Sequence, residues 1–420
     1  MPTAWPYGII LAILSLQPQE ETAPASKALE PEWGGWNQFR GPNRDGLSKD
    51  TGLLKEWSAQ GPPLAWTAQG LGAGYSGVSF AENLIFTLGD EGDTCNLHAL
   101  DRSDGKRVWS TGVGPAGGHA KVPGPRSTPA TDGRAVFALG QHGDLVAVRV
   151  TDGREVWRKS LMKDFGGGVP HFSYSESPLL DGDIVVCTPG GPGGSLVALK
   201  TDTGEKVWQS EEVKDPAQYA SLVPADFGGV RQYLLVTLQS VAGIGAKDGK
   251  LLWRVDRNEG RDVVATPVYR DRLVFVAGGY EAGCGAFQIT PADSRFPVDK
   301  VYSGRQMENH YGGVILVGDH LYGTDKSSLK CIELMTGTVV WQDRSVGRGS
   351  VAYADGHLVV RGERGSIALV EANPSGYKEK GRFLPPHEQN NRCWTPPTLH
   401  GGRLYVREQD ALYCYDVRAR

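Results

Sequence analysis

The stretch Ala99-Leu-Asp101-Arg-Ser-Asp104-Gly105-Lys-Arg-Val-Trp109 decides the fold, because it recurs along the chain. In every strong copy an aromatic residue follows a glycine by four positions. The five strongest copies centre on Gly105, Gly153, Gly204, Gly249 and Gly337. Their spacings are 48, 51, 45 and 88 residues, so the last gap spans two units and hides one degenerate copy.

The degenerate copy is expected near residue 293, where the segment from Ala286 to Asp293 fits the pattern. A seventh copy runs from Ala368 to Phe383. An eighth begins at Leu412 and lacks its tryptophan. The chain therefore contains eight related units.

Each unit predicts four short strands. Its upstream half opens on Ser-Pro or Thr-Pro, followed by a turn and a β-rich run, as at Ser127-Thr-Pro129. The glycine of the motif supplies a tight turn between the third and fourth strands. The tryptophan begins the outer strand, where its large area can seal one unit against the next. Four strands per 40–50 residues are typical of a propeller blade, and blades must close into a ring to bury their faces.

The missing outer strand has a donor near the start of the chain. Pro63-Leu-Ala-Trp66-Thr resembles an outer strand with no blade of its own before it. The predicted fold is all-β: an eight-bladed β-propeller of four-stranded blades, whose ring is closed by an N-terminal strand that completes the last blade. The predicted organisation is a signal peptide over residues 1–25, a linker and N-terminal strap over 26–62, and the propeller over 63–420.

Composition supports this class of protein. The 420 residues include 57 Gly and 26 Pro, with 11 Trp against 4 Met, which indicates many tight turns rather than helices. No Gly-X-Y period exists, and 40% hydrophobic residues exclude a disordered chain. A net charge of −4 gives no electrostatic footprint for nucleic acid or an anionic membrane surface.

The N-terminal segment indicates export. The apolar run from Trp5 to Leu16 is far shorter than the ~20 residues that span a bilayer and fits a signal-peptide core. Ala23-Pro24-Ala25 resembles a cleavage site, although no Lys or Arg precedes the run, and a frayed N-terminal segment is the alternative. The expected location is periplasmic or secreted, with no transmembrane span. The six cysteines include no C-x-x-C pair, so no zinc site is expected and no disulfide pairs are assigned.

The repeat resembles a known family. The pattern of Ala99–Trp109 is similar to the tryptophan-docking repeat of the bacterial pyrroloquinoline-quinone (PQQ)-binding-like propellers, which include quinoprotein dehydrogenases and relatives of the outer-membrane protein assembly factor BamB. The resemblance covers roughly residues 33 to 417. More specific segments, such as Trp36-Asn-Gln-Phe-Arg40-Gly-Pro-Asn-Arg44-Asp-Gly46 and Asn309-His310-Tyr-Gly-Gly313, resemble one secreted branch of these proteins.

The resemblance implies two activities that differ in class. Quinoprotein dehydrogenases use adjacent cysteines, a calcium ion, an Asp base and a Trp platform around the quinone, but no two cysteines are adjacent here and no calcium loop is present. A binding or scaffold module in the cell envelope is therefore expected, with a protein partner or a small anionic ligand. A PQQ-dependent dehydrogenase with a diverged site is the alternative, and it makes PQQ the candidate cofactor.

Candidate site residues follow from the propeller geometry, in which residues just before each innermost strand line the channel mouth. The predicted lining residues are Arg126, Tyr174, Glu176, Asn309, His310, Arg348, Trp394 and Arg407. Tyr75, Tyr219, Ser221 and Glu408 accompany them. Arginine forks and aromatic faces suit a planar anion. The alternative is that Arg126 and Arg348 pair with Glu176 and backbone carbonyls to plug the channel.

The strap before the ring has two interpretations. Trp36, Phe39 and Arg40 could clamp it onto one face of the propeller, or they could form a hook for a partner protein. Packing within the chain is the simpler expectation. The protein is expected to be a monomer.

Overall fold

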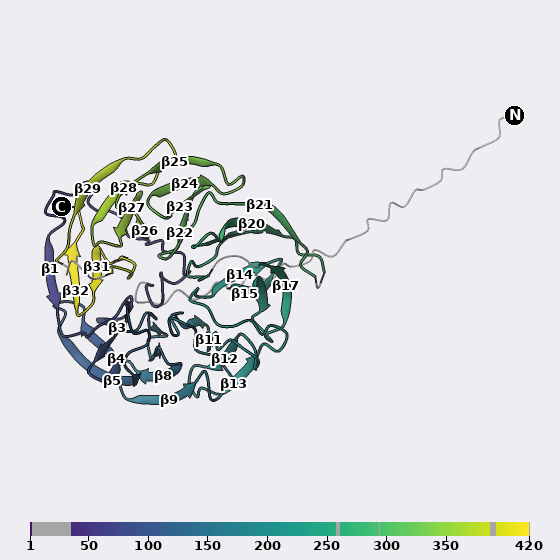
Figure 1. Ribbon diagram of the computed structural model, residues 1–420, viewed down its shortest axis with the longest axis horizontal. Helices are drawn as coiled ribbons and strands as arrows, with labels where there is room; N and C mark the ends of the chain where they lie inside the picture. The colour runs from purple at the N-terminus through teal and green to yellow at the C-terminus, as the bar shows by residue number, and fades with distance from the viewer. Residues whose placement is uncertain (2–34, 258–260, 294, 387–391, 420) are drawn as a thin grey trace.

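The computed structural model describes Met1 and residues 35–257, 261–293, 295–386 and 392–419. These residues form 32 β-strands and no α-helix. The strands pair into eight four-stranded antiparallel sheets, which Figure 1 shows arranged radially around one axis. The protein is therefore an eight-bladed β-propeller, as the repeat predicts.

The first four blades each begin with the innermost strand and end with the outer one. Blade 1 contains β2 (Ser79–Ala81), β3 (Leu84–Glu91), β4 (Thr94–Asp101) and β5 (Arg107–Pro115). Blade 2 contains β6 (Ala130–Thr131), β7 (Ala135–Leu139), β8 (Asp144–Arg149) and β9 (Glu155–Ser160). Blade 3 contains β10 (Leu179–Asp181), β11 (Ile184–Cys187), β12 (Val197–Lys200) and β13 (Lys206–Gln209). Blade 4 contains β14 (Val223–Phe227), β15 (Val230–Val236), β16 (Ser240–Gly245) and β17 (Leu251–Asp256).

The next three blades repeat this order, and the degenerate copy forms blade 5. Blade 5 contains β18 (Val268–Arg270), β19 (Leu273–Gly278), β20 (Gly283–Ile289) and β21 (Val298–Gly304). Blade 6 contains β22 (Val314–Val317), β23 (His320–Thr324), β24 (Leu329–Glu333) and β25 (Val339–Asp343). Blade 7 contains β26 (Gly349–Ala354), β27 (His357–Gly362), β28 (Ile367–Glu371) and β29 (Glu379–Phe383).

Blade 8 joins the two ends of the chain. It contains β30 (Thr398–His400), β31 (Arg403–Glu408) and β32 (Ala411–Asp416), and its outer strand is β1 (Leu64–Ala68). The register pairs Trp66 with Cys414 and Thr67 with Tyr413. The predicted closure by an N-terminal strand is confirmed, and Figure 1 shows β1 beside β32.

The hydrophobic core lies between the blades. Buried apolar side chains form eight clusters, and each cluster joins two neighbouring blades. One example packs Phe137 and Leu145 of blade 2 against Val185 and Leu199 of blade 3. A single blade would expose both of these faces to water, so the units are stable only as a ring.

Motif tryptophans dock most of the blades onto the next blade along the chain. The indole of Trp109 in blade 1 donates a hydrogen bond to the Val150 carbonyl of blade 2 at 2.9 Å, and its ring covers Gly153. Trp157 bonds Thr201 in the same way at 2.8 Å. Trp66 closes the cycle, because its indole donates to Arg102 at 3.2 Å and its ring covers Gly105. A glycine is required at these turns, where φ is positive and the facing ring leaves no room for a Cβ.

Blade 5 shows why its copy of the motif is degenerate. Its turn has Asp293 in place of the glycine, with a φ of 53°. The preceding tryptophan, Trp253, does not donate to that turn. Its indole donates instead to Gln232 of its own blade at 2.7 Å. The glycine and the docking indole are therefore lost together.

The strap crosses the ring and packs within the chain. Phe80 of blade 1 donates its amide to the Trp36 carbonyl at 2.9 Å, and Arg40 donates to the Val314 carbonyl of blade 6 at 2.8 Å. Arg44 reaches blades 3 and 4 and is 1% exposed. Figure 1 shows this segment near the centre of the ring.

Three features of the ends and cysteines complete the fold. The expected signal peptide falls within residues 2–34, outside the described part of the chain. No helix long and apolar enough to cross a membrane occurs in the described residues. All six cysteines are buried and free, including Cys187, Cys331 and Cys414, which lie in apolar strands.

Candidate functional site

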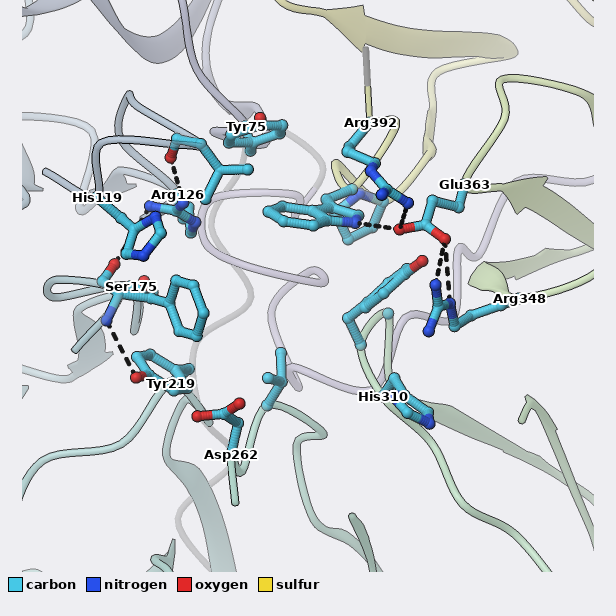
Figure 2. A pocket seen from close by; sticks show the side chains of 18 of the residues that line it. Tyr75, His119, Arg126, Ser175, Tyr219, Asp262, His310, Arg348, Glu363 and Arg392 are labelled. Carbon is cyan, nitrogen blue, oxygen red and sulfur yellow. Dashed lines mark hydrogen bonds and ion pairs between the residues drawn. The ribbon is translucent and has the colours of Figure 1, made fainter. Parts of the chain in front are cut away.

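A pocket of about 990 Å³ occupies the central channel. Its walls come mainly from the loops that precede the innermost strands, with further residues from loops between the second and third strands, and Phe39 of the strap forms part of its lining. The aromatic lining residues are Phe39, Tyr75, Phe172, Tyr219, Tyr280, Tyr311 and Trp394. The charged Lys, Arg, Asp and Glu residues are Lys121, Arg126, Arg348, Arg392, Asp262 and Glu363. The pocket therefore combines many ring faces with an excess of positive charge (Figure 2).

Arg126 holds one wall together. Its guanidinium donates to the carbonyls of Val122 at 2.5 Å and Phe172 at 3.3 Å. It also lies over the rings of Tyr75, at 5.3 Å from the centroid, and Trp394, at 5.9 Å. Such contacts between a cation and ring faces are stabilising. Burial lowers the pKa of Arg126, but the ordinary value is so high that the side chain keeps its charge.

Glu363 is the charged centre of the opposite wall. Its Oε2 accepts hydrogen bonds from Nε and Nη2 of Arg348 at 3.1 and 2.6 Å. Its Oε1 accepts from the Trp394 indole at 3.0 Å and lies 2.9 Å from Arg392 Nη1. Burial alone would raise the pKa of Glu363, but the donors from Arg348 and Trp394 outweigh it and the pKa is lowered. One carboxylate thus orients two arginines, which leaves one net positive charge in this cluster.

A third wall consists of aromatic rings that meet edge-on or at a tilt. His119 lies 4.6 Å from Phe172 between centroids and 5.1 Å from His171. Phe172 contacts Tyr219 at 5.9 Å, and the Tyr219 hydroxyl accepts the Phe172 amide at 3.2 Å. Burial, followed by the neighbouring His171, lowers the pKa of His119. This wall therefore presents mainly ring faces to the pocket, and its His119 imidazole is neutral at pH 7.

Neither ring nitrogen of His310 has a hydrogen-bond partner among the described residues, although His310 is only 7% exposed. Its ring meets Tyr280 edge-on at 4.5 Å. Burial first, and the Arg348 charge second, lower its pKa. The imidazole is therefore neutral at pH 7, with donor and acceptor capacity unused.

The structure brings four of the eight predicted site residues into the pocket. Arg126, His310, Arg348 and Trp394 line it, as do the accompanying residues Tyr75, Tyr219 and Ser221. The alternative prediction, in which Arg126 and Arg348 plug the channel by pairing with Glu176 and backbone carbonyls, does not describe this arrangement. Arg126 does bond backbone carbonyls, but Arg348 pairs with Glu363 rather than Glu176, and the space between the walls stays open.

The other four predicted residues are buried behind the lining. Tyr174 and Glu176 are each 1% exposed, and Ser175 between them faces the pocket instead. The Tyr174 hydroxyl donates to the Pro189 carbonyl at 2.9 Å, and Glu176 accepts the amide and hydroxyl of Thr188. Burial raises the pKa of Glu176 to about 7, with Thr188 and then Arg44 opposing it. Alternate residues of an extended segment point to opposite sides, so Ser175 faces the pocket while Tyr174 and Glu176 face away from it.

Asn309 and Arg407 are also structural in this arrangement. The Asn309 amide donates to the Thr324 carbonyl at 2.8 Å and is fully buried. Arg407 donates to the carbonyls of Leu71 and Gly72 at 3.0 and 2.9 Å, and burial lowers its pKa to about 9. A ligand in the pocket would contact neither residue.

The sequence interpretation missed several lining residues. Glu363 lies directly after β27, at the place in blade 7 that corresponds to Gln409 in blade 8, and both residues line the pocket although the sequence interpretation named neither. Arg392 and Tyr311 are close neighbours of predicted residues. Asp262 and the two histidines, His119 and His171, carried no signal, because they lie in loops with no repeat counterpart.

The calcium and quinone arrangement of the quinoprotein dehydrogenases does not fit these residues. In the described part of the chain, no three His, Cys, Asp or Glu side chains gather as a metal site. Glu363 is committed to two arginines and an indole, and all six cysteines lie apart as free thiols. The pocket therefore lacks the oxygen donors that calcium requires.

Comparison with known proteins shows which family the chain belongs to. The family model described as outer membrane protein assembly factor BamB matches residues 93–343, more than half of the sequence. The chain belongs to this family. A curated relative, the outer membrane protein assembly factor BamB of Burkholderia pseudomallei (strain K96243), is 22% identical over 353 residues, covering 73% of this chain and 86% of the relative.

Solved structures agree on the fold of this family member. The quinohemoprotein alcohol dehydrogenase of Comamonas testosteroni superposes with a TM-score of 0.66 at 10% identity, covering 94% of this chain and 82% of that one. The computationally designed Ika8 protein gives a TM-score of 0.58 at 12% identity, covering 84% of this chain and all of that one. At such identities the likeness concerns the propeller alone.

Proposed function

We propose that this BamB-family propeller is a periplasmic or secreted binding module that holds a small anionic ligand with a flat aromatic part in its central pocket. The observation that carries the proposal is the open pocket of about 990 Å³, which has ring faces on its walls and two more Lys and Arg than Asp and Glu residues. The volume is at the upper end of the ~300–1,000 Å³ that small-molecule sites occupy.

The arrangement of charge supports an anion. Arg348 and Arg392 both contact Glu363, so the carboxylate neutralises only one of them. Arg392 is 54% exposed and has donors left over for a ligand. Charge-assisted bonds from guanidinium groups to carboxylate or sulfonate oxygens are among the stronger polar contacts. The Trp394 face, held by the Glu363 bond, offers a stacking surface beside them.

An aromatic anion and its neutral counterpart test this proposal. We expect 8-anilinonaphthalene-1-sulfonate to bind the protein more tightly than uncharged N-phenyl-1-naphthylamine, as measured by fluorescence titration. The double variant Arg348→Gln/Arg392→Gln removes both cations of this wall, and its affinity for the sulfonate should fall by about tenfold, which corresponds to about 1.4 kcal/mol. The affinity of the double variant for the neutral probe should stay within about twofold of the wild-type affinity.

The control is Arg154→Gln, which removes an exposed arginine outside the pocket. It should leave both titrations unchanged. The affinity for the sulfonate should also weaken with ionic strength, because salt screens exposed charges. Equal binding of the two probes by the wild type, or equal loss in the control, would contradict an anion site in the pocket.

A second function, as a protein-binding scaffold, is favoured by the family match over residues 93–343. It predicts that envelope or outer-membrane proteins co-purify with the exported chain after mild crosslinking. The pocket function predicts that this capture is independent of Arg348 and Arg392. Loss of the capture in the double variant would instead make the pocket itself the protein-binding surface.

The dehydrogenase alternative has a direct assay. Incubation of the purified protein with PQQ and calcium, followed by alcohols or sugars and a redox dye, should give no dye reduction. The expectation rests on the donor set, which lacks the carboxylate cluster for calcium in the described residues. Stoichiometric quinone binding with substrate-dependent reduction would favour the enzyme.

A further inference from the structure

Asp262 is the one pocket carboxylate, among the described residues, that has neither a hydrogen bond nor an ion pair. It lies in the loop between β17 and β18 and is half-buried. Figure 2 shows its carboxylate directed toward the open centre, on the side of the view away from Tyr75, with no interaction drawn to it. Glu363, by contrast, accepts from Arg348 and Trp394.

The surroundings of Asp262 leave its acceptor capacity unused. Burial raises the pKa of the Asp262 carboxyl, and Arg261 and His171 lower it only in part. The Arg261 guanidinium lies over the Tyr280 ring at 5.9 Å, where it is engaged by the ring face. A carboxylate that loses water without gaining a donor is destabilised, so a donor supplied by a ligand would be stabilising.

The pocket therefore has two kinds of charged surface. Arg348 and Arg392 present donors around Glu363, whereas Asp262 presents an acceptor from another loop. Phe172, Tyr219 and Trp394 offer ring faces in the same cavity. A simple anion would use the arginines and the rings but would leave Asp262 unmatched.

We infer that the ligand is a zwitterion: a short peptide with an aromatic side chain, whose ammonium group is bound by Asp262 and whose carboxylate is bound by Arg348 and Arg392. This inference rests on the proposed function and adds the class of ligand to it. A short peptide is favoured over a free amino acid because the cavity of about 990 Å³ exceeds the space that one residue fills. The shared chemistry of the two is an ammonium, a carboxylate and an aromatic ring.

Isothermal titration calorimetry with four probes tests the assignment. The probes are the dipeptide Trp-Phe, its N-acetyl derivative, its C-terminal amide and free tryptophan. We expect Trp-Phe to bind most tightly to the wild-type protein. Acetylation removes the ammonium and amidation removes the carboxylate, so each should weaken binding by about tenfold.

The variant Asp262→Asn identifies the residue that reads the ammonium group. It should weaken Trp-Phe binding by about tenfold and leave the N-acetyl dipeptide unchanged, because that probe has no ammonium to lose. Asp299→Asn is the matched control, since Asp299 is an exposed carboxylate on β21, outside the pocket. It should bind all four probes as the wild type does. Thermal melting confirms that both variants are folded.

Three results would overturn the inference. The first is equal affinity for Trp-Phe and its N-acetyl derivative, and the second is an unchanged Trp-Phe affinity in Asp262→Asn. In either case, continued preference for the anionic naphthalene probe would leave the proposed function standing, whereas loss of that preference would remove both. The third is free tryptophan binding as tightly as the dipeptide, which would overturn the assignment of a peptide.

Discussion

Replacing Gly153 with alanine is expected to lower the free energy of unfolding by about 3 kcal/mol, because alanine strains the backbone at this turn and its Cβ overpacks the blade boundary. The φ of Gly153 is 69°, a conformation that costs an L-residue about 1–2 kcal/mol. An added Cβ would also lie 2.6 Å from the Trp109 ring and 2.7 Å from the Thr111 hydroxyl, both in the preceding blade. Overpacking of this kind typically costs a further ~1–3 kcal/mol.

A matched glycine separates the two contributions. Gly182 has nearly the same φ, 65°, but an added Cβ there would meet no atom within 4 Å. Gly182→Ala should therefore lose only the conformational part, about 1 kcal/mol. The measurement is the urea midpoint of both variants under identical conditions. Equal destabilisation would contradict the docking of Trp109 onto the Gly153 turn.

Replacing Arg44 with methionine is expected to destabilise the protein by about 3–5 kcal/mol, because several buried acceptors lose a charged donor at about 1–3 kcal/mol each. The guanidinium donates to the carbonyls of Leu222 at 2.6 Å, Pro178 at 2.9 Å and Ser177 at 2.8 Å. It also donates to the Gln38 side chain at 3.0 Å. Methionine fills a similar volume but removes the Arg44 donors from the carbonyls of Ser177, Pro178 and Leu222, whereas Gln38 Oε1 still accepts from the Leu180 amide.

The matched control is Arg44→Lys, which keeps the charge and supplies fewer donors in a different geometry. Its midpoint of thermal or urea unfolding should lie between those of the wild type and Arg44→Met. In limited proteolysis of Arg44→Met, the strap should be cleaved earlier than the propeller, because the strap loses its contacts with blades 3 and 4. Destabilisation below about 1 kcal/mol would contradict the claim that Arg44 fixes the strap to blades 3 and 4, since that is the scale of a single exposed ion pair.

The repeat made the fold predictable because one physical unit is used eight times. The glycine of one motif meets the tryptophan of the preceding motif across a blade boundary, as Gly153 and Trp109 do, so the spacing between copies in the sequence reports the packing of the ring. The absent eighth tryptophan had to be supplied from elsewhere, and Trp66 was the free candidate. The degenerate fifth blade was found by spacing alone.

The pocket was less predictable because its residues lie in loops outside the repeat. Whether a side chain faces the channel depends on single-residue alternation, which placed Ser175 in the lining and Tyr174 and Glu176 behind it. Asp262 and Glu363 come from loops whose lengths and shapes are not repeated. Local sequence patterns carry no information about which loop reaches the axis, so these contacts required the tertiary structure.

Every assignment in the pocket depends on closure of the ring by β1 and β32. The most direct test is the double variant Thr67→Cys/Tyr413→Cys, which puts two accessible thiols on residues that pair across the two strands. Mild oxidation should link positions 67 and 413 within one chain, identified by peptide mass spectrometry, while the six native buried thiols stay free. A folded double variant in which these two cysteines remain unlinked, or link only between chains, would contradict the closed eight-bladed ring.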